Sequence, residues 1–140
     1  EMCIRDSCYA VRKGHRKPRI AQTEDPDAIC IDGLSHAQIN DVFNRCRTFY
    51  SYDEATMYSQ FAVICGCESV VIPGEHANRA DWGRENELGK FGIAYGLEPS
   101  ELDHARATRD QLIELVRAKE ETGLETVRQF VDLTRKRFRP

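Results

Sequence analysis

The spacing of hydrophobic residues between positions 29 and 73 predicts alternating strands and helices. A short apolar run at 29–31 precedes a polar turn, and Ser35 with Gln38 three positions later has the form of a capping box, which opens a helix. Apolar residues then recur at helical spacing and share one side of this helix: Ile39, Val42, Phe43 and Cys46. The run at 69–72 is apolar without alternation, which is typical of a parallel strand covered on both faces.

A polar turn between a strand and a helix in this region is the first candidate for a ligand site. Residues 48–52 are rich in β-forming residues, and Asp53 is placed to cap the N-terminus of a helix that Gly66 ends. The apolar members of that helix are Met57, Phe61, Ala62, Ile64 and Cys65. Ligands of open α/β sheets bind at the carboxyl ends of the strands. We therefore expect the turn at 51–56 to carry the function.

The remaining segments complete an α/β domain. In chain order they are a strand at 8–12, a basic connection at 13–27, mostly loop with a helical turn at 74–90, and a last strand at 91–95. From Ser100 the pattern is helical, with an interruption at Gly123 and a second helix after it. The pattern predicts a Rossmann-like α/β fold with a mostly parallel sheet of about four to five strands, flanking helices and two C-terminal helices. We expect a binding domain at 8–98, with the helices at 99–140 packed on it.

The first seven residues are interpreted as an artefact rather than as natural sequence. The peptide MCIRDS at positions 2–7 resembles the translation of a transposase adapter used in preparing sequencing libraries. The natural chain is therefore expected to begin near Cys8, as a metagenomic fragment of a longer protein, and residues 1–7 are expected to have no packing partner. An ordinary N-terminus is the alternative. A signal peptide is not indicated, because the segment has no apolar core.

Composition limits the class of protein. The 140-residue chain is 41% hydrophobic, enough for one ordinary core, and no apolar run approaches the roughly 18 residues of a membrane span. The formal net charge of −3 argues against nucleic-acid binding. Of six cysteines, Cys3 belongs to the adapter-like segment, and the odd number left, several at expected core positions, favours reduced thiols and a cytoplasmic location.

Several segments, in this order, resemble one family of enzymes. They are IDGLSH at 31–36, FNRC at 43–46, SYD at 51–53, YS at 58–59, CGC at 65–67 and SVVIP at 69–73. Together they are similar to the C-terminal, donor-binding half of bacterial glycosyltransferases of the GT-B fold, closest to enzymes that build lipopolysaccharide core or other surface polysaccharides. The resemblance covers roughly residues 9 to 109.

The resemblance implies a domain that binds a nucleotide-activated sugar against an N-terminal domain that this chain lacks. The nucleotide-sugar is the substrate, no other cofactor or bound metal is implied, and the acceptor is a glycan or glycolipid. The base that deprotonates the acceptor commonly belongs to the missing domain, so no catalytic residue is assigned and the chain is expected to be inactive alone. Basic residues near the C-terminus allow peripheral contact with the inner face of a membrane, although a solvated helix end is the plainer interpretation.

The candidate residues of the donor site are Arg12, Lys13, Asp53, Thr56, Tyr58, Ser59 and Glu75. Arg12 and Lys13, at the exit of the first strand, supply positive charge for a diphosphate, and Thr56 with the following helix amides supplies hydrogen-bond donors. Tyr58 and Ser59 lie near the start of the helix, and Glu75 follows the last strand of the region. Plainer interpretations remain open: the two cations are simply solvated, and Asp53 is only a helix cap.

The sequence departs from the common retaining pattern of this fold. That pattern has two glutamates, thirteen and five residues before the glycine, and counting back from Gly66 these positions hold Asp53 and Phe61. The second carboxylate is missing, which leaves both ribose recognition by a glutamate and the stereochemical outcome open.

Two further signals do not indicate a metal site. Cys65 and Cys67 join a helix end to a buried strand, and without a second such pair they are interpreted as core residues. The four histidines are scattered along the chain. A function from another class also remains open, a non-catalytic α/β module for regulation or protein interaction, because fold alone does not determine function.

Overall fold

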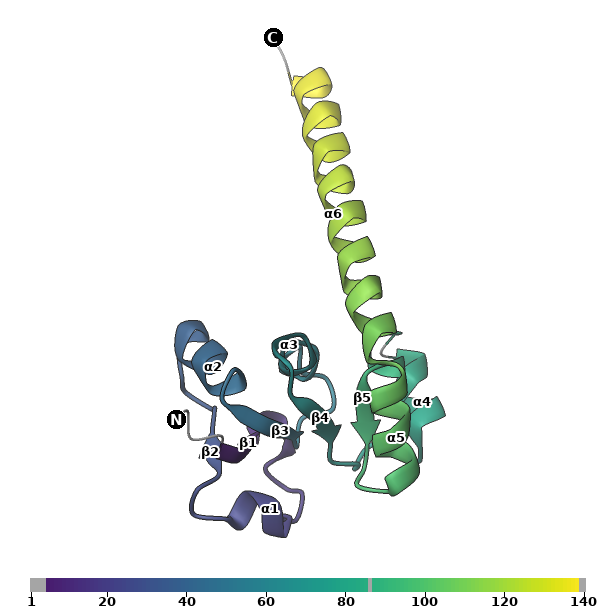
Figure 1. Ribbon diagram of the computed structural model, residues 1–140. Coiled ribbons are helices and arrows are strands. Elements are labelled where there is room, and N and C mark those ends of the chain that lie inside the picture. Colours follow the sequence, from purple (N-terminus) through teal and green to yellow (C-terminus); the bar gives the residue numbers. More distant parts are fainter. Residues whose placement is uncertain (1–4, 86, 139–140) are drawn as a thin grey trace.

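The computed structural model describes residues 5–85 and 87–138 and contains a parallel five-stranded sheet in the order β2-β1-β3-β4-β5 (Figure 1). The strands are β1 (Arg5–Ala10), β2 (Ile29–Cys30), β3 (Cys46–Ser51), β4 (Glu68–Val71) and β5 (Ile93–Tyr95). The helices are α1 (Ala21–Glu24), α2 (His36–Phe43), α3 (Tyr58–Cys65), α4 (Arg79–Glu85), α5 (Pro99–Ala107) and α6 (Arg109–Phe138), with 3-10 turns η1 (Arg12–Gly14) and η2 (Glu87–Lys90). The Rossmann-like α/β fold expected from the sequence is confirmed.

Helices pack on both faces of the sheet because alternate strand residues point to opposite sides. Tyr9, Tyr50, Val70 and Ala94 lie side by side on four adjacent strands and pack with Ala105 of α5. The next residues back along β1 and β3 are Cys8 and Phe49, which face the opposite side and pack with α2 and α3. This double cover explains why the strands read as apolar runs.

The predicted ends of two helices are confirmed. The hydroxyl oxygen of Ser35 accepts a hydrogen bond from the Gln38 amide, and the Gln38 side chain accepts one from the Ser35 amide, which completes the capping box of α2. Gly66 ends α3 with a φ of 106°, in the left-handed region that favours glycine.

The start of α3 was predicted wrongly. The helix begins at Tyr58, with Met57 at the N-cap position, so Asp53 does not cap it. Asp53 instead accepts a hydrogen bond from the amide of Ala55, two residues on, which is the turn that aspartate side chains commonly form. This bond holds the chain in a loop between β3 and α3.

The segment 74–90 is more helical than its polar sequence indicates. It contains α4 and η2, and the reason is tertiary packing: Trp82 is buried and stacks on Tyr95 with ring centroids 5.2 Å apart. Arg79 also donates to a Glu101 carboxylate oxygen at 2.8 Å, which joins α4 to α5. Neither partner is near in sequence, so local pattern could not reveal the helix.

The C-terminal helices are divided at Thr108 rather than at Gly123, which was the expected interruption. The Thr108 hydroxyl donates to the carbonyl of His104 and accepts from the amide of Gly92, which fixes the end of α5 against the chain before β5. Gly123 lies inside α6 with no atom near the place of a Cβ, so the helix continues through it.

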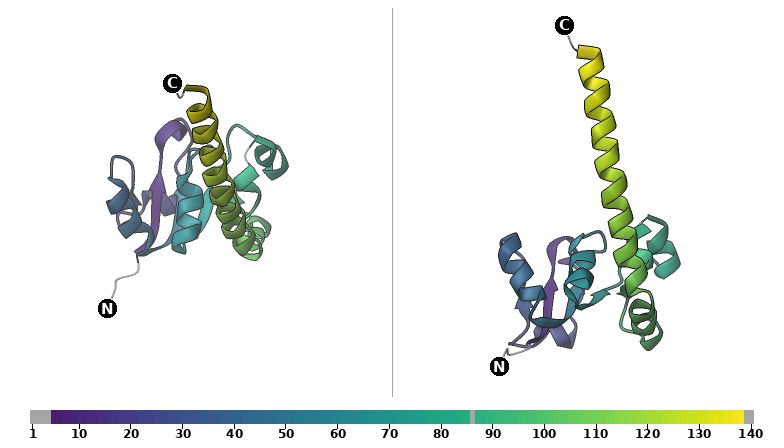
Figure 2. Two further views of the ribbon diagram at one scale, coloured as in Figure 1. Left: turned by 90° about the horizontal axis from the view of Figure 1, so that it is seen from above. Right: turned by 45° about the horizontal axis from the view of Figure 1, so that its top comes forward.

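Only the first part of α6 packs against the sheet. Leu112 is fully buried, whereas every described residue from 117 to 138 is exposed. The helix projects away from the α/β unit, as two further views show (Figure 2). Exposed apolar side chains along it are Leu124, Val127, Phe130, Val131, Leu133 and Phe138. The expectation that the C-terminal helices pack on the domain therefore describes α5 and the start of α6, but not the rest of α6.

Residues 5–7 belong to the sheet, contrary to the expectation that they have no packing partner. Arg5 lies opposite Cys46 and Ser7 opposite Thr48 in the pairing of β1 with β3. Ser7 is buried, and its hydroxyl donates to the carbonyl of Gln22 at 3.1 Å. The expected boundary between artefact and natural chain thus falls inside β1.

Cysteine side chains occupy much of the core between the sheet and α2. Three of the described cysteines are buried: Cys8, Cys46 and Cys67. The Cys67 thiol lies 3.1 Å from the Phe43 carbonyl oxygen. Hydrogen bonding with Cys46 and with Cys67, and then burial, raise the pKa of Cys8. Cys67 is therefore a core residue, as predicted, while Cys65 at the end of α3 is half-buried.

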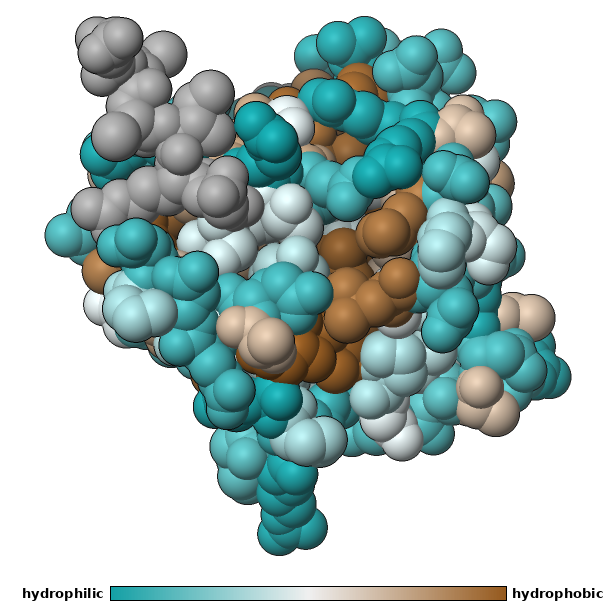
Figure 3. Space-filling view, turned by 60° about the horizontal axis from the view of Figure 1, so that its bottom comes forward, coloured by the Kyte–Doolittle hydropathy of each residue, from teal (hydrophilic) through white to brown (hydrophobic). Residues whose placement is uncertain are grey.

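The surface seen from below is mostly hydrophilic, with apolar side chains exposed between polar ones in a hollow (Figure 3). No helix in the part of the chain that the structure describes is both long and apolar enough to cross a membrane.

Candidate functional site

A cavity of about 610 Å³ opens at the carboxyl ends of β1, β3 and β4. It lies where the sheet changes direction, because the chain goes from β1 to β2 on one side and then returns to place β3 on the other. Open α/β sheets bind ligands at this point. Its lining comes from the segment after β1 (Lys13, Gly14, Lys17), the segment after β3 (Tyr52, Asp53, Glu54, Ala55, Met57, Gln60) and the segment after β4 (Glu75, His76, Trp82, Glu85).

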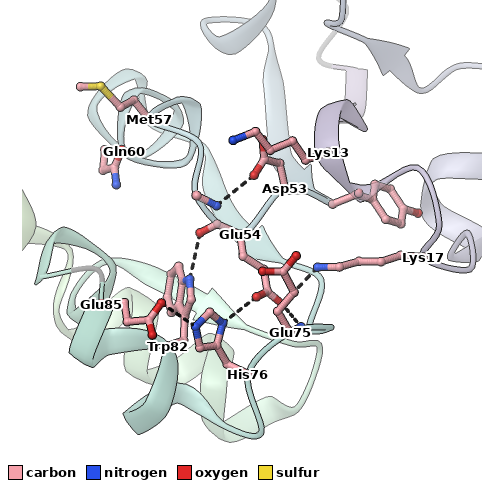
Figure 4. Close-up of a pocket in the computed structure, with 13 residues that line it drawn as sticks. Lys13, Lys17, Asp53, Glu54, Met57, Gln60, Glu75, His76, Trp82 and Glu85 are labelled. Atoms are coloured by element: carbon pink, nitrogen blue, oxygen red, sulfur yellow. Dashed lines mark hydrogen bonds and ion pairs between the residues drawn. The ribbon is translucent and has the colours of Figure 1, made fainter.

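The carboxylate of Glu54 joins these three segments. Its Oε1 atom accepts from Lys17 Nζ at 3.1 Å and from the Glu75 amide at 3.0 Å. Its Oε2 atom lies 2.7 Å from Nδ1 of His76. These side chains converge on one side of the cavity (Figure 4). The Glu54 side chain is only 5% exposed, and burying a carboxylate without such partners would destabilise the folded protein. With these partners, Glu54 connects the three segments that form the wall of the cavity.

Glu54 is held in its charged form. Burial alone would raise its pKa, but the hydrogen bonds from His76, the Glu75 amide, Lys17 and Tyr95 outweigh that effect and lower the pKa below its usual value. Tyr95 shows the opposite result, since burial and the neighbouring Glu54 raise the pKa of its hydroxyl to about 12. The phenol therefore stays protonated near neutral pH and can donate to Glu54 Oε1, 3.0 Å away.

His76 lies between two carboxylates. Its Nδ1 faces Glu54, and its Nε2 lies 3.3 Å from Glu85 Oε2. The hydrogen bonds with Glu54 and then with Glu85 raise the pKa of His76, which favours the imidazolium form with both ring nitrogens donating.

The two lysines of the cavity differ in their pairing. Lys17 donates to Glu54 and also to the carbonyl oxygen of Ile72 at 2.6 Å, so its charge is already paired within the protein. Lys13 has no ion-pair partner among the residues that the structure describes and is exposed at the cavity. Of these two cations, Lys13 is the one available to an anionic ligand.

The side chains of Trp82 and Gln60 also line the cavity. The indole Nε1 of Trp82 donates to the carbonyl oxygen of Glu54 at 2.9 Å, which holds α4 against the loop after β3. The side chain of Gln60 is buried, and its Oε1 has no hydrogen-bond partner within the described residues. A buried carboxamide that lines a cavity and lacks a partner is a group that a ligand or water can satisfy.

The turn after β1 approaches the end of β3 very closely. A Cβ atom placed on Gly14 would lie 2.1 Å from the carbonyl oxygen of Tyr52. Because that neighbour is backbone, it cannot move aside as a flexible side chain would. Glycine at this position therefore lets two walls of the cavity meet.

Three of the residues predicted from the sequence line this cavity: Lys13, Asp53 and Glu75. Asp53 is buried, with Oδ1 accepting from the Ala55 amide at 3.0 Å. Glu75 has an exposed side chain, while its amide donates to Glu54. The structure thus brings together one cation and two carboxylates from three different loops.

The other four predicted residues lie outside the lining. The Arg12 guanidinium stacks 4.4 Å from the ring centroid of Tyr58 and lies 3.8 Å from an Asp32 carboxylate oxygen. Thr56 is buried, and its hydroxyl oxygen accepts from the Tyr58 amide at 3.3 Å. Ser59 is also buried, and its hydroxyl lacks a partner within residues 5–85 and 87–138. The backbone of Arg12 has a φ of 41°, and its amide donates a hydrogen bond to the Asp32 carboxylate. Arg12 is therefore directed toward Asp32 rather than toward the cavity.

Sequence reasoning missed most of the charged network. Glu54 lies in the same predicted turn as Asp53, and His76 follows Glu75. If the neighbours of the predicted residues had been counted as candidates, Glu54 and His76 would have been among them. Trp82 is the largest apolar residue of a polar segment, which is a signal of packing. Lys17 gives no such signal, because it lies in a run of basic residues that look solvated.

The described part of the chain has no group of three or more His, Cys, Asp or Glu side chains arranged to hold a metal ion. No protein-family model, curated protein or solved structure matches this chain.

Proposed function

We propose that this chain is the donor-binding part of a glycosyltransferase and that its cavity binds a nucleotide-activated sugar. The observation that carries the proposal is a cavity at the carboxyl ends of β1 and β3 that contains Lys13, a cation with no ion-pair partner in the described part of the chain. A diphosphate needs positive charge, and open α/β sheets bind nucleotides at this place.

The size and polarity of the cavity support a ligand of this class. A volume near 610 Å³ is within the usual range of sites for small molecules and cofactors. Asp53 and Glu75 provide carboxylates that can accept hydrogen bonds from sugar or ribose hydroxyls, and Gln60 provides a carboxamide. One cation beside several acceptors suits a ligand that is anionic at one end and rich in hydroxyls at the other.

The transfer step needs groups that we place outside the present chain, on the acceptor and on a further domain of the same polypeptide. We propose that a glycan or glycolipid acceptor and an N-terminal domain complete the site, with the base supplied by that domain. The exposed apolar side chains of α6 support a partner, since large apolar groups on one helix commonly mark a surface where another domain packs.

Titration of the chain with uridine, guanosine and cytidine diphosphates, followed by amide NMR, tests the proposal. Binding should shift the signals of Lys13, Asp53 and Gln60. Lys13→Ala should weaken binding by about tenfold, the effect of losing one charged hydrogen bond, without changing the thermal melt. Lys136→Ala, on the exposed part of α6, is the matched control and should bind like the unchanged protein.

The alternative is a non-catalytic α/β module for regulation or protein interaction. It predicts that no nucleotide shifts any signal around the cavity at millimolar concentration. That outcome would contradict the transferase proposal. The cavity contains a lysine without an ion-pair partner and a carboxamide oxygen without a hydrogen-bond partner among the described residues, and both favour the ligand-binding function over it.

A further inference from the structure

The two carboxylates on either side of His76 hold it with unequal strength. The bond from Nδ1 to Glu54 is 2.7 Å long, and the Glu54 side chain is 5% exposed. The contact from Nε2 to Glu85 is 3.3 Å long, and the Glu85 side chain is 78% exposed. A buried short bond fixes the ring, whereas a long contact to a solvated side chain is easily exchanged.

We propose that Nε2 of His76 contacts a phosphate oxygen of the bound nucleotide and that Glu85 occupies this place until the ligand arrives. The inference rests on the proposed function and identifies a phosphate-contacting residue of that same cavity. Both His76 and Glu85 line the cavity, so the exchange happens at its surface (Figure 4).

The surrounding charges favour such an exchange. The groups that face His76 or line the same wall are the carboxylates of Glu54, Glu75 and Glu85, the ammonium of Lys17 and the phenol of Tyr95. Glu54 is already balanced by Lys17 and His76. Replacing the Glu85 carboxylate by a phosphate therefore exchanges one anion for another at Nε2. A diphosphate carries more charge and more acceptor oxygens than a carboxylate, so it is the better partner for an imidazolium.

In this arrangement Glu54 is a positioning residue. It fixes which side of the imidazole faces the protein, and so directs Nε2 toward the cavity. The contacts of Glu54 with Lys17 and with the Glu75 amide hold it in place from two other segments. The same network that shapes the wall of the cavity thus presents one N–H donor to the ligand.

Four variants of the full chain, one of them a control, separate the two sides of the imidazole. Glu85→Gln removes the competing charge, whereas Glu98→Gln makes the same charge change at an exposed position at the start of α5. His76→Asn keeps a donor near the position of Nδ1 but has nothing at Nε2. His76→Gln places a donor near Nε2, so it tests for rescue. The probes are inorganic pyrophosphate and uridine diphosphate, measured by calorimetry.

Glu85→Gln should tighten binding of both probes by about three- to tenfold, since a competing anion is removed. Glu98→Gln should leave the affinity unchanged. His76→Asn should weaken binding by about tenfold or more, and His76→Gln should recover part of the loss. NMR of the imidazole supplies a second readout: in Glu85→Gln the pKa of His76 should fall, and pyrophosphate should raise it again.

The outcomes distinguish this inference from the function on which it rests. If the diphosphates bind and shift Lys13 and Asp53, but the variants at His76 and Glu85 bind like the unchanged protein, the inference is overturned and the proposed function stands. If neither probe binds the unchanged protein or Glu85→Gln at millimolar concentration, both fail. If His76→Asn does not fold, an unchanged affinity in Glu85→Gln is still enough to reject the exchange.

Discussion

His76 and Glu54 join the loop after β4 to the loop after β3 through one contact, with Nδ1 of the imidazole 2.7 Å from Oε2 of the carboxylate. Lys17, from the segment after β1, reaches the other oxygen of the same carboxylate. The contacts between three loops that are far apart in sequence therefore depend on the single buried charge of Glu54. We expect this charge to determine both the shape of the cavity and the stability of this end of the sheet.

Replacing that charge should destabilise the protein. Glu54→Gln keeps the size of the side chain but leaves Lys17 without its charged partner in a mostly buried place, and breaking a buried ion pair from one side costs about 3 kcal/mol. Urea unfolding measures the loss. Glu85→Gln, on the exposed side of His76, is the control and should change the free energy of unfolding by less than about 0.5 kcal/mol. Equal effects of the two substitutions would contradict the central role of Glu54.

Stability should also depend on pH in a defined way. The pKa of Glu54 is lowered from 4.5, so its contribution is present above pH 4.5 and is lost as the pH falls through the folded-state value. The pKa of His76 is raised from 6.5, so its contribution is fully present below pH 6.5 and is lost as the pH rises through the folded-state value.

For this pair we expect the stabilising contribution to be greatest between about pH 4.5 and 6.5 and to decline on both sides. Unfolding by urea across a pH series measures it. His76→Asn should flatten the alkaline decline, and Glu54→Gln should weaken both declines. An alkaline decline that persists unchanged in His76→Asn would show that another group causes it.

Much of the fold followed from local pattern, and the particular elements show why. The capping box at Ser35, the left-handed Gly66 and the apolar run of β4 are each encoded by a few adjacent residues. Helix α4 and the division at Thr108 were missed because both depend on partners distant in sequence. Trp82 needs Tyr95 and the Glu54 carbonyl, and Thr108 needs the amide of Gly92.

The candidate site shows the same limit. Parallel topology was enough to place Lys13, Asp53 and Glu75 at one edge of the sheet. The direction of a side chain within a turn was not predictable, because it depends on which neighbour pairs with it. Arg12 and Lys13 are adjacent, yet Arg12 contacts Asp32 and Tyr58 while Lys13 stays unpaired among the described residues.

A side chain at position 14 should disrupt the cavity. Gly14→Ala would place its Cβ 2.1 Å from the Tyr52 carbonyl oxygen, so the turn after β1 must move away from β3. We expect a loss of about 2 kcal/mol, in the range for overpacking, together with weaker nucleotide binding. Gly123→Ala is the control, since no atom lies near that position and alanine favours a helix. A stable Gly14→Ala variant would show that the turn adapts.

Removing residues 1–7 should lower stability, because Arg5 and Ser7 pair with β3. The expected loss is at least about 1 kcal/mol, from strand hydrogen bonds and the bond from Ser7 to Gln22. Strand pairing uses the backbone, so a chain with Arg5→Thr and Asp6→Val should keep its stability. This tolerance also means that an adapter-encoded segment could complete β1. Thermal melts of the three chains measure the difference, and an unchanged melt after the deletion would show that the first half of β1 contributes nothing.

Shortening α6 should leave the folded unit intact. Residues 120–138 are exposed throughout, whereas Lys119 still pairs with Glu87 at 2.7 Å, so a chain that ends at Lys119 keeps every buried contact of this helix. Its free energy of unfolding should change by less than about 0.5 kcal/mol.

Two matched leucines of α6 test the same division within the complete chain. Leu112 is fully buried and packs with Trp82 and Ile93, so Leu112→Ala should cost about 3 kcal/mol. Leu124 is 61% exposed, so Leu124→Ala should cost less than about 0.5 kcal/mol in the isolated chain. Urea unfolding compares them. If Leu124→Ala or the shortened chain were destabilised as much as Leu112→Ala, the exposed part of α6 would have to pack against this domain, and its apolar side chains would no longer be free for a partner.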